Sequence, residues 1–153
     1  MNIKINQGFT LIELLVVIAI IGILSSIVLV SLNTARSKGI DAAVMSDLDG
    51  IRTQAQIYFG DNGNSYGSNE SVESDCLAED NLFNETTIKN QISAADATNG
   101  ASAGIICNVS GGGTAYAVSA ELLATAGTYY CIDSAGLGII TETELGETDT
   151  SCQ

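Results

Sequence analysis

The chain has 153 residues and a strongly acidic balance, with 18 Asp and Glu against 5 Lys and Arg and a formal net charge of -13 at pH 7. It contains no histidine, which excludes a Ser-His-Asp triad, a Cys-His pair and imidazole metal ligands. Five basic residues are too few to neutralise a nucleic-acid backbone, so we expect no intrinsic nucleic-acid binding. The length corresponds to one domain.

The N-terminal part is far more apolar than the rest. Residues 9–32 contain one ionisable side chain, Glu13, and between Leu14 and Val30 the polar residues are Ser25 and Ser26. About 20 apolar residues cross a bilayer core, so this segment predicts a membrane helix. A cleaved secretory signal is the first alternative, but the run is too long and small residues do not flank a cut at its end. A plain anchor, the second alternative, leaves a charged side chain inside the apolar run unexplained.

Residues 8–24, GFTLIELLVVIAIIGIL, resemble the N-terminal signature of the type IV pilin family. In that family a short polar leader ends in Gly, Phe follows, and Glu comes four positions later. A prepilin peptidase cleaves after the Gly and methylates the new amino terminus. The resemblance therefore implies a leader at residues 1–8, cleavage between Gly8 and Phe9, N-methylation of Phe9 and an assembly role for Glu13. It says little about residues 60–153.

The positions of Phe9 and Glu13 have a physical meaning of their own. Residues four apart share a helical face, so in a helix that begins at Phe9 the carboxylate lies over the first turn, at the positive end of the helix dipole. An amine freed at Phe9 would pair with Glu13 of its own chain or of an adjacent copy, and the second pairing would set the axial register of neighbouring subunits. The alternative is a lone carboxylate that reaches the lipid headgroups.

The sequence departs from the family at one point, because it contains no proline and has Val30 where pilins usually have a helix-breaking Pro. In the family, the helix between the position of Gly22 and that Pro can unwind in the filament. Gly22 and Ser26 fit two roles equally well: a weak point of the helix or a seam of small residues for close helix packing.

The remaining pattern predicts an α+β fold, a long N-terminal helix packed against a small antiparallel β-sheet as in pilins. Residues 33–59 continue the helix from residue 9 in amphipathic form, with most of their charges, including Asp41, off the apolar stripe, and a polar Gly-rich stop follows. We expect an irregular connection at 60–113 with a short helix at 86–97. Residues 114–153 hold three expected strands and a C-terminal tail. The strands are predicted at residues 114–122, 128–133 and 138–143.

The four cysteines are too widely spaced for a zinc site and predict two disulfides in an exported domain. They are Cys76, Cys107, Cys131 and Cys152. Three pairings are possible, and free thiols are the alternative. The pilin resemblance favours Cys76 with Cys107 and Cys131 with Cys152, the latter tying down the C-terminal tail. Disulfides place residues 33–153, which follow the apolar run, outside the cytoplasm. The basic residues Arg36 and Lys38, just beyond the apolar run, oppose this orientation under the positive-inside rule.

The resemblance implies a structural subunit, and because the residues form no visible acid-base or metal-ligand pattern, we expect no catalytic residues, no cofactor and no metal. Such a subunit is first a single-pass precursor in the bacterial inner membrane, with its N-terminus in the cytoplasm, and then part of an extracellular filament used in adhesion, motility or uptake. Its partners are the membrane, a prepilin peptidase, the inner-membrane pilus assembly machinery and other copies of itself. Two alternatives stay open: a pseudopilin of type II secretion, and a monomeric, membrane-anchored acidic binding domain.

Overall fold

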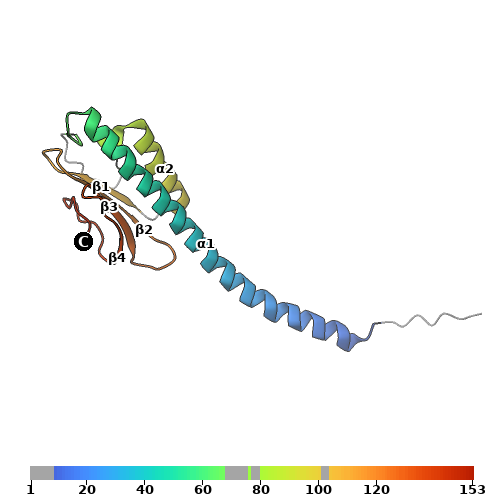
Figure 1. The fold of residues 1–153 in the computed structure, drawn as a ribbon. Coiled ribbons are helices and arrows are strands. Elements are labelled where there is room, and N and C mark those ends of the chain that lie inside the picture. Colours follow the sequence, from blue (N-terminus) through green and yellow to red (C-terminus); the bar gives the residue numbers. More distant parts are fainter. Residues whose placement is uncertain (1–8, 68–75, 77–79, 101–103) are drawn as a thin grey trace, which may run out of the picture. The chain divides into compact units, whose positions relative to one another are not determined.

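The computed structural model describes residues 9–67, 76, 80–100 and 104–153, so the expected leader at 1–8, with Gly8, lies outside the described residues (Figure 1). The described elements are a long helix α1, a short 3-10 helix η1, a second helix α2 and four strands, which confirms the α+β class. The chain divides into two compact units. The first ends at Arg36, and the second, which we call the head, runs from Ser37 to Gln153. Each unit is described by itself below.

Helix α1 spans Leu11–Asp61, two residues later at each end than the predicted 9–59. Within the first unit, every described side chain from Phe9 to Arg36 is exposed. This part of α1 is long and apolar enough to cross a membrane, and none of the side chains in its most apolar stretch is buried. The described residues of the first unit therefore leave this apolar surface uncovered.

In the second unit, the C-terminal half of α1 supplies one side of the core. The predicted stripe is confirmed, because Val44, Leu48, Ile51 and Ala55 are fully buried. Burying a Val, Leu or Ile side chain contributes about 1.5–3 kcal/mol, so this stripe is a main source of the packing energy that holds the helix to the head. Asp41, which lies off the predicted stripe, is nevertheless buried, with only 6% of its surface exposed.

Helix α2, Thr86–Asn99, follows η1, Leu82–Asn84, and confirms the helix predicted at 86–97. Its apolar face buries Ile88, Ile92 and Ala95 in the same core as the α1 stripe. The side chain of Gln91 lies where a Cβ atom on Gly50 would be. Glycine at position 50 therefore lets a side chain of α2 pack directly on the backbone of α1.

The sheet has four antiparallel strands in the order β1-β2-β3-β4. Strands β2 (Tyr116–Glu121), β3 (Tyr129–Asp133) and β4 (Gly138–Thr141) are the three that were predicted. Strand β1 (Ile105–Val109) was missed, so the expectation of an irregular connection throughout 60–113 was wrong there. Four of the five β1 residues are buried, and a strand covered on both faces lacks the apolar-polar alternation by which strands are recognised.

Both faces of the sheet are covered over β1, β2 and β3, whereas the edge strand β4 is partly exposed. One face packs on α1 and α2, where the hydroxyl of Tyr130 donates a hydrogen bond to Asp49 Oδ1 at 3.0 Å. Burial and the neighbouring Asp49 carboxylate raise the pKa of Tyr130, which keeps the hydroxyl a donor. The opposite face carries a second apolar cluster, in which Ala117 and Cys131 meet Leu145 and Cys152 of the C-terminal tail. The head thus has three layers: helices, sheet and tail.

Candidate assembly site at the start of the apolar helix

The first turn of α1 contains Glu13, the single ionisable residue of the apolar segment. Its Oε2 atom accepts hydrogen bonds from the backbone N–H of Thr10 at 2.8 Å and from the Thr10 hydroxyl at 2.7 Å. In return, the N–H of Glu13 donates to Thr10 Oγ1 at 3.3 Å. Thr10 is therefore the N-cap of α1, and Thr10 with Glu13 forms a reciprocal capping box.

The capping box gives the carboxylate two hydrogen-bond donors from its own chain, next to the positive end of the helix dipole. Among the described residues, Glu13 Oε1 has no donor, so one oxygen stays available to a further partner. Phe9 immediately precedes the cap and is 89% exposed. An amine on Phe9 exists only after cleavage, so its pairing with Glu13 stays a prediction.

Thr10 is the site residue that our sequence reasoning missed. The predicted helix begins at Phe9, which places Thr10 inside the first turn, whereas the observed helix begins at Leu11. The signal was present as the pattern Thr10-Leu-Ile-Glu13, a Thr followed three residues later by Glu before an apolar run.

Helix α1 continues without interruption through Gly22 and Ser26. Apart from its chain neighbours and the adjacent backbone of the helix, no described atom lies within 4 Å of where a Cβ atom on Gly22 would be. The hydroxyl of Ser26 donates to the carbonyl of Ile23 at 2.8 Å, so it is already satisfied within the helix. Both roles of this segment, a weak point or a packing seam, stay predictions.

In the head, two disulfides join the four cysteines, Cys76 with Cys107 and Cys131 with Cys152. This is the pairing that the pilin resemblance favours. The Cα atoms are 5.1 Å and 5.7 Å apart, which is within the usual range for a disulfide.

The C-terminal tail is also held by two buried polar side chains, Asn108 and Asp133. Asn108 Nδ2 donates to the carbonyls of Gly146 and Asp149 at 2.7 and 2.8 Å. Asp133 Oδ2 accepts the N–H of Cys152 at 3.0 Å, while its Oδ1 accepts those of Ala135 and Leu137. The tail is therefore built into the head.

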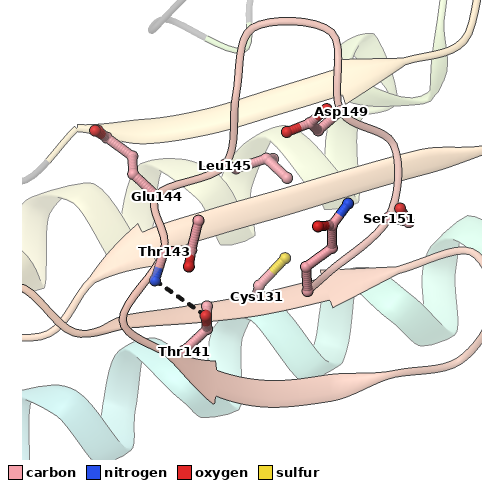
Figure 2. A pocket seen from close by; sticks show the side chains of 8 residues that line it. Cys131, Thr141, Thr143, Glu144, Leu145, Asp149 and Ser151 are labelled. Atoms are coloured by element: carbon pink, nitrogen blue, oxygen red, sulfur yellow. Dashed lines mark hydrogen bonds between the residues drawn. The ribbon is translucent and has the colours of Figure 1, made fainter.

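A small cavity lies beneath the tail, and Figure 2 shows its lining side chains. Its volume is about 30 Å³, which has room for water but is too small for an organic substrate. The lining consists of Cys131, Thr141, Thr143, Glu144, Leu145, Asp149, Ser151 and Gln153. Across the described ranges, no group of three or more His, Cys, Asp or Glu residues is placed to hold a metal ion.

The described chain thus consists of an exposed apolar helical segment, capped by Thr10 and Glu13, followed by an acidic α+β part. A family model described as the prokaryotic N-terminal methylation motif matches residues 3–29. The chain is also 44% identical over 66 residues to PilA4 of Thermus thermophilus, the type IV wide pilus major component. That match covers 43% of this chain and 50% of the relative, so the chain spans about half the length of the curated relative it matches. No solved structure matches the chain. Together, the motif and the relative support the type IV pilin family.

Proposed function

We propose that this chain is a type IV pilin-like structural subunit. A prepilin peptidase cleaves it between Gly8 and Phe9 and methylates the new amino terminus. The subunit is held in the inner membrane with its N-terminus in the cytoplasm, and the pilus assembly machinery then polymerises it through α1 into an extracellular filament. The methylation motif at residues 3–29 and the PilA4 relative support this proposal.

The observation that carries the proposal is the capping box at the N-terminus of an apolar helix whose side chains are exposed. An apolar surface of this length must be covered by lipid or by other protein, because water exposure of so many Leu, Ile and Val side chains is unfavourable. Lipid serves this purpose for a single subunit. In a filament, the same helices of neighbouring copies would replace the lipid.

Glu13 would act in both states. In the membrane, Thr10 supplies two donors to the carboxylate, which lowers the cost of holding it among apolar groups. In the filament, the methylated amine of an adjacent copy would bind the open Oε1 atom. This charge pair closes at one axial offset between subunits, so it favours one register, and losing either partner would leave an uncompensated charge.

Intact-mass measurement tests the processing step. The chain is expressed in cells with a prepilin peptidase, recovered from the membrane fraction and weighed with and without reduction. The expected mass lacks residues 1–8, carries one added methyl group and gains four hydrogens on reduction, as two disulfides require. A chain that keeps Met1 despite an active peptidase would overturn the proposal.

A Glu13→Val variant tests assembly. We expect this variant to insert into the membrane normally and to yield far fewer filaments in the sheared fraction than the unmodified chain. Ser31→Val is a suitable control, because it introduces the same residue at an exposed position of the same helix. Equal filament yields from the two chains would refute the assembly role of Glu13, and normal insertion without filaments from either chain would favour a monomeric anchored domain. Filaments confined to the periplasm would favour a pseudopilin.

A further inference from the structure

The loop between β2 and β3, residues 122–128, is an uncharged stretch of this acidic chain, as are residues 97–120 and 134–141. It contains no charged residue, although the chain has a net charge of -13. Leu123 is 41% exposed, and residues 124–127 are exposed as well. Glu121, the nearest acid along the chain, is half-buried at the end of β2.

A buried carboxylate holds this loop against α1. Asp41 Oδ1 accepts the N–H of Leu123 at 2.7 Å, and its Oδ2 accepts the N–H of Ala124 at 3.0 Å. Asp41 is 6% exposed, so its charge depends on these donors for compensation. The molecule therefore uses a buried acid to fix an exposed, uncharged loop in position.

The loop is bound to the part of α1 where the second unit begins, because Asp41 is four residues after Ser37. Asp41 lies nine residues after Leu32, and nine residues reach at most about 30 Å even when fully extended. Two exposed cations, Arg36 and Lys38, lie in this interval. Among the described residues, neither of these cations makes an ion pair, whereas Arg52 pairs with Asp49. Most acids of the head would be repelled by an anionic membrane, whereas Lys38 and this loop would not.

We propose that Lys38 and residues 122–128, together called the basal surface, rest on anionic lipid headgroups while the subunit is unassembled. The ammonium group of Lys38 would lie among lipid phosphates, and Leu123 would enter the interface between headgroups and acyl chains. This inference rests on the proposed function, because it requires the apolar helix to be in a membrane.

The chain contains no tryptophan, so a single introduced Trp reports on its own surroundings. Three variants of the full chain are compared in vesicles of brominated phosphatidylglycerol at a low protein-to-lipid ratio: Leu123→Trp in the loop, Leu137→Trp as a matched control, and Leu24→Trp in the apolar helix. Leu137 is 44% exposed, close to the value for Leu123, but lies in the β3–β4 turn. Bromine quenches Trp fluorescence on contact. We expect strong quenching for Leu24→Trp, clear quenching for Leu123→Trp and several-fold less for Leu137→Trp.

Salt and charge provide a second measurement. Raising the ionic strength from about 0.01 M to about 1 M shortens the Debye length from about 30 Å to about 3 Å. Quenching of Leu123→Trp should then fall markedly, and adding Lys38→Glu should have the same effect at low salt. Quenching of Leu24→Trp should change in neither case.

The outcomes separate this inference from the proposed function. Absence of quenching for Leu24→Trp would mean that the helix is not in the bilayer, which overturns the proposed function itself. Quenching of Leu24→Trp with equal, weak quenching of Leu123→Trp and Leu137→Trp would overturn only the basal surface. A change in the fluorescence of Leu123→Trp that depends on the protein-to-lipid ratio and not on bromine would indicate contact with a second copy. This result would also overturn the proposed lipid contact of the basal surface.

Discussion

At the scale of single residues, Thr10 decides how the chain accommodates a carboxylate in an apolar helix. Its hydroxyl and its N–H both bind Glu13, and its Oγ1 accepts a backbone donor that the helix leaves unpaired. The cap and the assembly glutamate are therefore one unit, and a change at Thr10 alters the state of Glu13 without changing its charge.

Replacing Thr10 with Val keeps the shape of the side chain and removes the hydroxyl. We expect loss of about 1 kcal/mol of capping free energy and fraying of the first turn. Hydrogen exchange of the amides at residues 10–14, measured in micelles, should be faster in Thr10→Val and unchanged in Thr10→Ser, which keeps the hydroxyl. Equal exchange in all three chains would contradict the capping box.

Gly113 is a second residue whose identity is dictated by its surroundings. Its φ is 65°, and a Cβ atom there would meet the carbonyl of Gly67 and the hydroxyl of Ser65. The N–H of Tyr66 also donates to the Gly113 carbonyl at 2.8 Å. The β1–β2 turn therefore packs on residues 65–67, which follow α1. The three consecutive glycines at 111–113 do not by themselves reveal this contact.

We expect Gly113→Ala to lower the free energy of unfolding by about 2–4 kcal/mol, because it combines an unfavourable φ with a backbone clash. Gly112→Ala is the matched control, since beyond its chain neighbours the nearest atom to its Cβ would be Thr114 Cγ2 at 3.9 Å and its φ is not positive. The control should change stability by less than about 0.5 kcal/mol. Urea unfolding of the two variants makes the comparison, and equal midpoints would refute the packing argument.

At the scale of elements, helix α2 depends on the N-cap Glu85. Its Oε2 accepts the N–H groups of Thr87 and Ile88 at 2.8 and 2.9 Å. Burial acts to raise the pKa of Glu85, but these hydrogen bonds together lower it below the usual value of 4.5. A lowered pKa in the folded state means that the ionised cap stabilises the fold above pH 4.5, and that this contribution is lost as the pH falls through the folded-state pKa.

The Glu85→Gln variant should therefore be less stable than the unmodified chain at neutral pH, by about 0.5 kcal/mol because the carboxylate is only partly buried. The difference should disappear as the pH falls below 4.5. Thermal unfolding at several pH values measures it, with Glu142→Gln in the exposed tail as control. A difference that grows on acidification would have the wrong sign and would refute the capping role.

At the scale of the whole molecule, the sheet is stabilised from both sides, by helices on one face and by the C-terminal tail on the other. The disulfide between Cys131 and Cys152 closes a sequence separation of 21 residues, and Asn108 and Asp133 hold the same tail by hydrogen bonds. The acidic tail is thus an ordered layer of the head.

Replacing both Cys131 and Cys152 with Ala should lower the free energy of unfolding by about 3 kcal/mol, from the chain entropy returned to the unfolded state. The tail should also become open to hydrogen exchange and proteolysis at residues 143–153. Replacing Cys76 and Cys107, with a separation of 31 residues, should cost about as much but leave the tail protected. Equal tail protection in both double variants would contradict the tethering role of the second disulfide.

Much of this protein was determined by the sequence alone, because the features concerned depend on residues a few positions apart. The apolar run, Glu13, the amphipathic stripe, α2 and three of the four strands are local patterns, and the cap at Thr10 was readable in the same way. The burial of Asp41, the fourth strand and the hydrogen bonds that hold the tail depend instead on the packing of the whole chain. Asp41 binds residues 82 and 83 positions away, and Asn108 binds residues 38 and 41 positions away. Contacts at such separations depend on how the chain packs, so no local pattern of charge or hydropathy encodes them.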